Sequence, residues 1–337
     1  MNSANNISQV FDNHGRAISY VRLSVTDRCN LRCFYCMPAT GMTFLPRKEL
    51  LSYEEMERLI KIMAEMGVSK VRITGGEPFV RRDLIDFLRR AKAIKGIEEI
   101  HITTNGVLTK KYVPILKEIG IASINLSLDT LDKEKFKELT RRDEFDKVWE
   151  TFNTILEHDI PLKLNAVVID GKNTDDIIPM VELAEKYAVG VRFIEEMPFN
   201  GGDAHFQKIK WNHHKILETI QSKYPNISTV KSAPNSTSSN YRIEGHKGTF
   251  GIIAAYSRTF CGSCNRIRIT SQGNLQTCLY GNSVLSIRDL LRNNKDDEVI
   301  KQALLKTFSN RAKDGFEAEK NRKTDSTKTE SMSVIGG

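Results

Sequence analysis

The six cysteines of the chain form two groups of three. They are Cys29, Cys33 and Cys36 in the stretch CNLRCFYC (C-x₃-C-x₂-C), and Cys261, Cys264 and Cys278 further on (C-x₂-C-x₁₃-C). Thiolates are soft ligands that favour iron–sulfur clusters or zinc, and a closed [4Fe–4S] cluster takes four of them. Three thiolates leave one iron open to a ligand that the protein does not supply. The spacing therefore predicts two under-ligated metal centres.

Zinc remains an alternative for both centres on the cysteines alone. One of the seven histidines could complete a triplet, or all six cysteines could meet at one shared site. No histidine lies close to the first triplet in sequence, whereas His246 lies upstream of the second, whose C-x₂-C pair suits zinc. A non-enzymatic zinc-bearing nucleic-acid module or an iron–sulfur electron carrier is thus the alternative from a different class, although a carrier would want four cysteines per cluster.

The positive charge of the chain is concentrated in one segment. The net charge is +8, and residues 201–294 alone hold twelve Lys or Arg against four Asp or Glu. A local excess of this size favours an anionic partner. Arg266 and Arg268 stand two apart on an expected strand beside Cys264, so both side chains point to one face, and guanidinium groups bind phosphate oxygens with paired donors.

Composition and the N-terminal sequence limit where the protein works. The chain has 337 residues, 40% of them hydrophobic, which suggests two domains at roughly 100–200 residues each. No uncharged apolar run approaches the roughly 20 residues of a membrane span. The opening MNSANNISQVFDNHGR is polar where a signal peptide is apolar. We therefore expect a cytoplasmic protein without a membrane partner, whose cysteines bind metal and form no disulfides.

Strands alternate with helices through the first two hundred residues, which indicates βα units, a parallel sheet and an α/β fold. The expected strands are 20–25, 70–74, 100–104, 123–128, 162–168 and 191–196. Six strands are two short of a closed eight-stranded barrel, so we expect a partial (β/α)₆ TIM-like barrel. Ser52 and Glu55 predict a capping box for a helix that ends near Gly67, and its methionine-rich stripe is expected in the core.

The rhythm changes after residue 200, which predicts a smaller α+β segment carrying the second triplet. Residues 232–240 are typical of a loop, GTFGIIAAY and NRIRIT predict strands of a different sheet, and helices return from about residue 286. The polar residues 317–331 are typical of a flexible tail. The expected domains are 1–230 and 231–316, followed by a tail at 317–337 that ends in Gly336 and Gly337.

The first triplet resembles the signature of radical S-adenosylmethionine (SAM) enzymes, C-x₃-C-x-aromatic-C, with Tyr35 as the aromatic residue. A second mark of that family, GGEP at 75–78, follows the second expected strand. The resemblance implies a [4Fe–4S] cluster on the three cysteines, whose fourth iron is chelated by the amino and carboxylate groups of SAM. The cosubstrate would then supply the missing ligand. By the same resemblance SAM is contacted by Tyr35, Gly75, Gly76, Glu77, Ser127 and Met197.

Further stretches are similar to the GTP 3′,8-cyclase family of molybdenum cofactor biosynthesis. They include KVRITGGEPFVRRDL, ITTNG, SLDTLD, RFIEEMP, FCGSCNRIRIT and the terminal IGG. The resemblance implies a lyase with two [4Fe–4S] clusters that converts GTP to (8S)-3′,8-cyclo-7,8-dihydroguanosine 5′-triphosphate. The second cluster would hold the guanine. The residues implied around GTP are Arg22, Lys70, Arg72, Thr103, Lys163, Arg192, Arg266 and Arg268, and the Gly-Gly tail would reach into the active site.

The same resemblance implies partners. They are an external low-potential reductant and the next cofactor-biosynthesis enzyme, which would receive the product, and a homodimer is compatible with it. A radical SAM enzyme that modifies a peptide or tRNA is the nearest alternative. Peptide-modifying members usually carry more C-terminal cysteines, and the basic segment lacks the interleaved aromatic residues that single-stranded RNA recognition favours, so we expect no nucleic-acid partner. No residue is assigned as a general acid or base.

Overall fold

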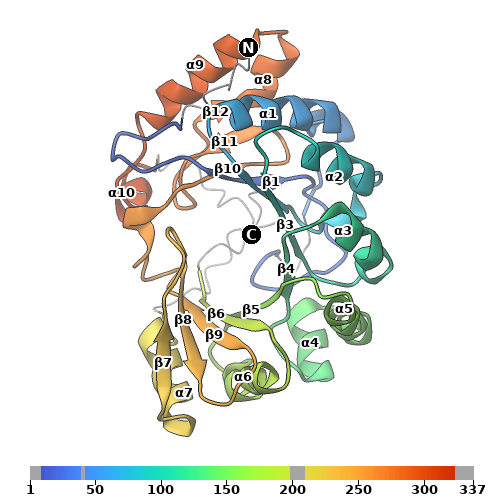
Figure 1. Cartoon of the computed structure of the whole chain (residues 1–337), viewed down its shortest axis with the longest axis vertical. Helices are drawn as coiled ribbons and strands as arrows, with labels where there is room; N and C mark the ends of the chain where they lie inside the picture. The colour runs from blue at the N-terminus through green and yellow to red at the C-terminus, as the bar shows by residue number, and fades with distance from the viewer. Residues whose placement is uncertain (1–8, 39–41, 198–208, 323–337) are drawn as a thin grey trace, which may run out of the picture.

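One curved sheet organises the protein. The computed structural model describes residues 9–38, 42–197 and 209–322. Within them, twelve strands form a single sheet in the order β12-β11-β10-β1-β2-β3-β4-β5-β6-β9-β8-β7. Figure 1 shows the sheet curving around a central space, with α1 to α6 along its outer side.

The six expected strands are confirmed as a consecutive parallel series. They are β1 (Tyr20–Ser24), β2 (Lys70–Thr74), β3 (Glu99–Thr104), β4 (Ser123–Ser127), β5 (Leu162–Val168) and β6 (Gly190–Glu195). The helices between them are α1 (Tyr53–Glu65), α2 (Leu84–Lys92), α3 (Val113–Ile119), α4 (Lys133–Thr140), α5 (Phe145–Glu157) and α6 (Ile177–Lys186). Because parallel strands place their carboxyl ends at one edge, the loops that follow these strands meet there.

The first helix forms as expected from its sequence. The Ser52 hydroxyl accepts from the Glu55 N–H at 3.2 Å, and the Glu55 carboxylate accepts from the Ser52 N–H at 2.7 Å. This reciprocal cap satisfies two N–H groups that would otherwise lack partners. Met56 and Met63 are fully buried, which confirms that the methionine stripe belongs to the core.

The later strands extend the same sheet, so the expectation of a second sheet was wrong. β9 (Thr249–Ile253) pairs parallel with β6, and β10 (Arg266–Ile269) pairs parallel with β1. An open six-stranded sheet leaves unpaired backbone groups along both edges, and these two strands cover them. β8 (Ser238–Ile243) and β7 (Ile227–Val230) continue antiparallel beyond β9, and β11 (Asn274–Gln276) and β12 (Leu285–Ser286) continue antiparallel beyond β10.

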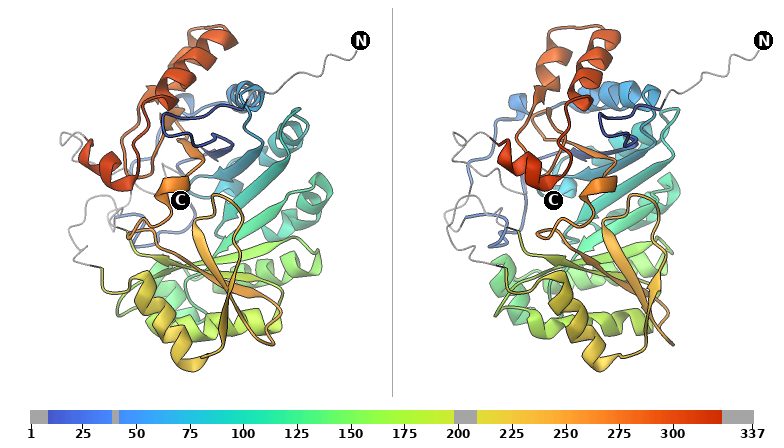
Figure 2. Two further views of the ribbon diagram at one scale, coloured as in Figure 1. Left: turned by 60° about the vertical axis from the view of Figure 1, so that its left-hand side comes forward. Right: turned by 90° about the vertical axis from the view of Figure 1, so that its left-hand side faces the viewer.

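The remaining helices lie at the two ends of the sheet. α7 (His213–Lys223) lies with β7 and β8 at one end, and α8 (Ile287–Arg292) and α9 (Asp297–Phe308) lie at the other (Figure 2). The 3₁₀ helices are η1 (Arg47–Glu49), η2 (Pro78–Val80), η3 (Lys110–Tyr112), η4 (Thr174–Asp176) and η5 (Cys261–Ser263). Within the described ranges, no helix is long and apolar enough to span a bilayer.

The flexible tail was expected to begin at residue 317, but the structure has a helix there. α10 (Gly315–Lys320) includes its first residues, and Ala318 is buried against the segment that holds Cys261 and Tyr280. The Asp314 side chain caps this helix, accepting from the N–H groups of residues 316 and 317 at 2.9 Å. The boundary expected at residue 230 falls between the paired strands β7 and β8, and the division into domains remains a prediction. Gly336 and Gly337 lie outside the described residues.

Candidate active site

The first triplet lines a cavity of about 200 Å³ at the carboxyl ends of β1 to β6. Its three cysteines follow β1, and the GGEP turn follows β2. Of the residues expected to contact SAM, Tyr35, Gly75, Gly76, Ser127 and Met197 line this cavity. The structure therefore brings together residues from positions 29 to 197 of the chain.

The two glycines of the GGEP turn allow it to approach the cysteine loop closely. Gly75 has a φ of +139°, and a Cβ there would lie 2.4 Å from the Thr26 carbonyl oxygen. A Cβ on Gly76 would lie 2.3 Å from the Arg28 carbonyl oxygen. The Gly76 N–H donates to the Thr26 oxygen at 2.9 Å, which joins the turn to the loop just before Cys29. Neither glycine tolerates a side chain without displacing that loop.

We expect Gly76→Ala to weaken SAM binding by at least tenfold. The added methyl group meets backbone atoms of Arg28, which cannot rotate away as a side chain could. Gly171→Ala is the control, because no heavy atom lies within 4 Å of its added Cβ; it strains the backbone at a φ of +70° but meets no neighbouring residue. Calorimetric titration of each anaerobically reconstituted variant with SAM measures the effect. Equal affinities in the two variants would contradict this account of the turn.

Glu77 supports the GGEP turn through hydrogen bonds. It lines neither this cavity nor the larger cavity at the second triplet. Its carboxylate accepts from the Asn105 N–H at 2.7 Å, the Thr104 hydroxyl at 2.8 Å and the Phe79 N–H at 3.1 Å. Burial raises the pKa of Glu77 to about 7, although these donors oppose the rise. Its contacts thus favour a positioning role over the direct SAM contact that the resemblance implied.

Two residues that the sequence did not single out support the first triplet. The Asn105 amide donates to the Cys29 sulfur at 3.6 Å and to the Asn30 side-chain oxygen at 2.8 Å. The Tyr35 hydroxyl donates to Asp129 at 2.6 Å. The stretches ITTNG and SLDTLD contain Asn105 and Asp129, so the motifs that carried the resemblance mark them, but nothing in the sequence showed which cysteine or tyrosine they would contact.

The chemistry of the first triplet fits a metal cluster. Burial, together with the nearby Glu77 carboxylate, raises the pKa of Cys29 to about 12. Burial and the Asp129 carboxylate raise the pKa of Cys33 well above its ordinary value. Two such thiols ionise together only when a cation compensates their charge, and iron bound to thiolates supplies that charge.

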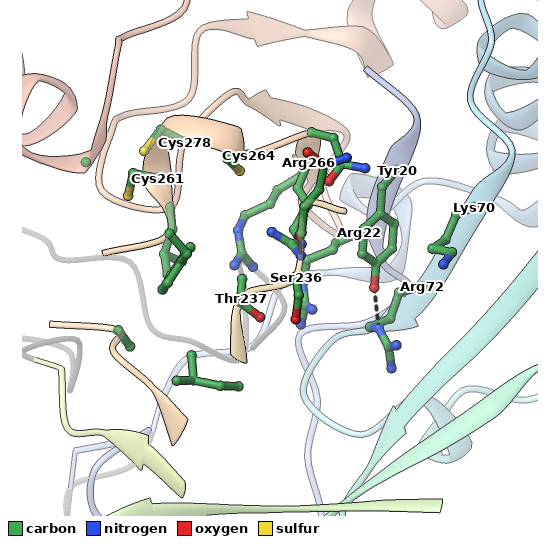
Figure 3. A pocket seen from close by; sticks show the side chains of 18 of the residues that line it. Tyr20, Arg22, Lys70, Arg72, Ser236, Thr237, Cys261, Cys264, Arg266 and Cys278 are labelled. Atoms are coloured by element: carbon green, nitrogen blue, oxygen red, sulfur yellow. Dashed lines mark hydrogen bonds between the residues drawn. The ribbon is translucent and has the colours of Figure 1, made fainter. Parts of the chain in front are cut away.

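A larger cavity, of about 580 Å³, joins the second triplet to the basic residues of the sheet. Figure 3 shows the sulfur atoms of Cys261, Cys264 and Cys278 at one end of the pocket. The arginine side chains and Tyr20 line the pocket beyond the cysteines. The volume falls within the usual range for small-molecule sites. Asn165, Ile194 and Met197 line both cavities, so the two share a wall.

Most residues expected around GTP line this larger cavity. They are Arg22, Lys70, Arg72, Lys163, Arg192, Arg266 and Arg268. Thr103 is the exception, because it lines the smaller cavity with the first triplet. Thr103 pairs with Asn125 of β4. It lies nearer the carboxyl end of β3 than Glu99 and His101, which pair with Lys70 and Arg72 of β2.

The cations of the larger cavity are crowded enough to repel one another. Burial and the charge of Arg268 lower the pKa of Arg22 well below its ordinary value. Burial and Arg72 lower the pKa of Arg192 to about 10, and burial and Arg192 lower the pKa of Lys163 to about 8. A polyvalent anion in the cavity would relieve this repulsion.

Tyr20 is a polar member of the cavity that the sequence did not reveal, because a tyrosine in a strand is typical of the core. The Arg72 Nε donates to its hydroxyl at 2.5 Å. Burial opposes ionisation of Tyr20, but Arg72 and Arg22 outweigh it and lower its pKa to about 8. The tyrosine therefore orients Arg72 within the basic wall.

The geometry gives little support to a mononuclear zinc site. Among the described residues, no three Cys, His, Asp or Glu side chains are arranged to hold a single metal ion. Zinc needs its ligand atoms about 2.0–2.3 Å from one point. In an iron–sulfur cluster each cysteine binds a different iron, so the thiols need not converge in this way.

Comparison with known proteins agrees with both halves of the site. Residues 23–184 match the Radical SAM superfamily, and residues 189–316 match the family described as Molybdenum Cofactor Synthesis C. The crystal structure of SuiB from Streptococcus suis shares the fold, with a TM-score of 0.61 over 92% of this chain and 70% of SuiB, at 18% sequence identity. That likeness concerns the fold alone.

Curated relatives have much higher sequence identity. The GTP 3′,8-cyclase of Syntrophomonas wolfei is 43% identical over 88% of this chain and 91% of its own length. The mitochondrial GTP 3′,8-cyclase of Arabidopsis thaliana is 40% identical over 88% of this chain and 76% of its own. The chain spans about half the length of other relatives, such as the molybdenum cofactor biosynthesis protein moc-5 of Caenorhabditis elegans, at 41% identity and 50% of that protein. From these identities, together with the two cysteine-lined cavities, we conclude that the chain belongs to the GTP 3′,8-cyclase family of radical SAM enzymes.

Proposed function

We propose that this chain converts GTP to (8S)-3′,8-cyclo-7,8-dihydroguanosine 5′-triphosphate, the first step of molybdenum cofactor biosynthesis, with SAM as cosubstrate. One observation carries the proposal: two cavities, each lined by three cysteines, share the wall formed by Asn165, Ile194 and Met197. A radical formed in one cavity would therefore meet a substrate bound in the other without crossing solvent. The relatives named GTP 3′,8-cyclase support the choice of substrate.

The residues of each cavity suggest which group they would hold. The first triplet would hold a [4Fe–4S] cluster with SAM against Tyr35, Gly75, Gly76, Ser127 and Met197. When bound and reduced, this cluster supplies the electron that cleaves SAM. The second triplet would hold the other cluster at the guanine end of GTP.

The basic wall of the larger cavity would bind the triphosphate. GTP carries about four negative charges near neutral pH, and arginine presents paired donors to phosphate oxygens. Tyr20 holds Arg72 in place for this contact. The enclosing strands would exclude water from the reacting sugar and fix its distance from the shared wall, which is how positioning contributes to such a reaction.

One experiment distinguishes this proposal from its alternatives. The full chain is reconstituted anaerobically with iron and sulfide, reduced, and incubated with SAM, with and without GTP. We expect 5′-deoxyadenosine and a cyclised nucleotide of the same mass as GTP to form together, and about eight iron atoms per chain. An electron carrier or nucleic-acid module would form no 5′-deoxyadenosine. A peptide- or tRNA-modifying enzyme would leave GTP unchanged, and either result would overturn the proposal.

The remaining features of the family are also proposals for this chain. They are an external low-potential reductant, transfer of the product to the next biosynthetic enzyme, a homodimer, a Gly336–Gly337 tail in the active site, and the cytoplasm as compartment. One relative is named as mitochondrial, so the compartment has to be determined by localising the protein itself.

A further inference from the structure

A buried arginine–aspartate–arginine group, formed by Arg16, Asp12 and Arg311, lies beside the second triplet, and its two arginines line the larger cavity. Asp12 Oδ2 accepts from Arg16 Nε at 2.7 Å and from Arg311 Nη1 at 3.0 Å. The Asp12 side chain has no exposed surface, and that of Arg311 is only 3% exposed. The three residues come from opposite ends of the described chain. Charged groups are placed this deep only when each is paired and bonded.

Arg311 joins two of the chain segments that carry cysteines. Its Nη1 donates to the carbonyl oxygen of Cys264 at 3.3 Å, and its Nη2 donates to that of Arg266 at 3.0 Å. The same Nη2 donates to the carbonyl oxygen of Thr277, the residue before Cys278, at 3.1 Å. One guanidinium therefore fixes the backbone at Cys264 and next to Cys278.

Arg16 fixes the backbone at Cys261, the third cysteine of this triplet. Its Nη1 donates to the carbonyl oxygen of Cys261 at 3.3 Å and to that of Lys313 at 2.7 Å. Its Nη2 donates to the Ala312 carbonyl oxygen at 2.8 Å. Arg16 thus ties Cys261 to the segment between α9 and α10, and Asp12 fixes both arginines relative to each other.

Arg311 also places charge beside one sulfur atom. Its Nη2 lies 4.0 Å from Cys264 Sγ. The first triplet has the opposite surroundings, since the carboxylates of Glu77 and Asp129 face its cysteines. Charge and hydrogen bonds near the sulfur atoms are what proteins use to set the potential of a bound cluster.

We propose that Arg311 is a positioning residue of the second triplet, which holds the Cys264 and Cys278 segments together and raises the reduction potential of the cluster bound there. The inference rests on the proposed function in requiring iron at this triplet. Arg311 also lines the larger cavity, but in this role it acts through its contacts with the cysteine segments. The positive charge favours the reduced cluster, which carries one more negative charge than the oxidised form.

The test uses the full chain with Cys29, Cys33 and Cys36 replaced by alanine, so that only the second triplet binds a cluster. In this background Arg311→Met, Arg311→Lys and Asp12→Asn are compared with the exposed control Arg242→Met. A redox titration followed by electron paramagnetic resonance gives the potential, and the rate of iron loss to a chelator reports on positioning. Neither readout depends on turnover.

We expect Arg311→Met to disfavour reduction at least tenfold, a shift of 59 mV for one electron, and to speed iron loss. Arg311→Lys keeps the charge but not the paired donors, so it should preserve most of the potential while still losing iron faster. Asp12→Asn should shift the potential in the opposite direction, which keeps the test decisive if Arg311→Met does not fold. Unchanged potentials in the variants would overturn the role of Arg311, whereas absence of iron from the parent chain would overturn the proposed function itself.

Discussion

We expect Cys29→Ser, reconstituted anaerobically and reduced, to form no 5′-deoxyadenosine. Cys29 is one of only three thiols in the smaller cavity, and a serine hydroxyl does not replace a thiolate on iron. With two thiolates left, the site loses the cluster from which the electron would come. Detection of 5′-deoxyadenosine by chromatography after incubation with SAM and GTP measures the loss, which should exceed a thousandfold.

Cys264→Ser is the matched control, because it makes the same chemical change in the other cavity. We expect this variant to keep part of the SAM cleavage but to form no cyclised nucleotide, since the guanine end of the larger cavity is altered. If Cys29→Ser cleaved SAM at the rate of the unaltered chain, the smaller cavity would not be where cleavage occurs. If both variants lost cleavage equally, the division of labour between the triplets would be wrong.

The sequence was sufficient to predict the barrel strands because their signals are local. β1 to β6 are short, largely buried stretches that contain β-branched residues and alternate with helices, and the capping box at Ser52 depends on residues three apart. The placement of β9 and β10 in the same sheet was not predictable in this way. β9 pairs with the free edge of β6, and β10 pairs with the free edge of β1. The paired residues are far apart in sequence: 59 positions separate Gly190 from Thr249, and 246 separate Tyr20 from Arg266.

In the candidate site, too, features with a local sequence signal were predicted and features that depend on distant contacts were not. The cysteines, Arg266 and Arg268 were identifiable from residue type and spacing, whereas the family resemblance supplied the other five basic residues that line the larger cavity. Asp12, Arg16 and Arg311 were missed because the contacts that give them a role are distant in sequence: 299 residues separate Asp12 from Arg311, and 245 separate Arg16 from Cys261. Thr103 was assigned to the nucleotide, but it lines the smaller cavity with the first triplet. A resemblance names residues but does not say how far along its strand each residue lies, and that position decides which cavity the residue lines.

The crowded basic wall has an energetic consequence for the protein without substrate. The pKa of Arg192 is lowered to about 10, first by burial and then by Arg72. A base whose pKa is lower in the folded than in the unfolded chain destabilises the fold wherever it stays charged, which includes neutral pH. Affinity for the anion is thus obtained at the expense of stability, as is common at functional sites.

We therefore expect Arg192→Met to have two opposite effects. GTP binding should weaken about 10- to 100-fold, since hydrogen bonds to charged groups contribute about 1.5–3 kcal/mol. The ligand-free protein should become more stable, by on the order of 1–3 kcal/mol, because the unfavourable charging that lowers the pKa of Arg192 to about 10 is removed. Calorimetric titration with GTP and thermal unfolding without it measure the two effects. The exposed Arg242→Met should change neither, and a loss of both affinity and stability in Arg192→Met would mean that Arg192 supports the fold instead of the anion site.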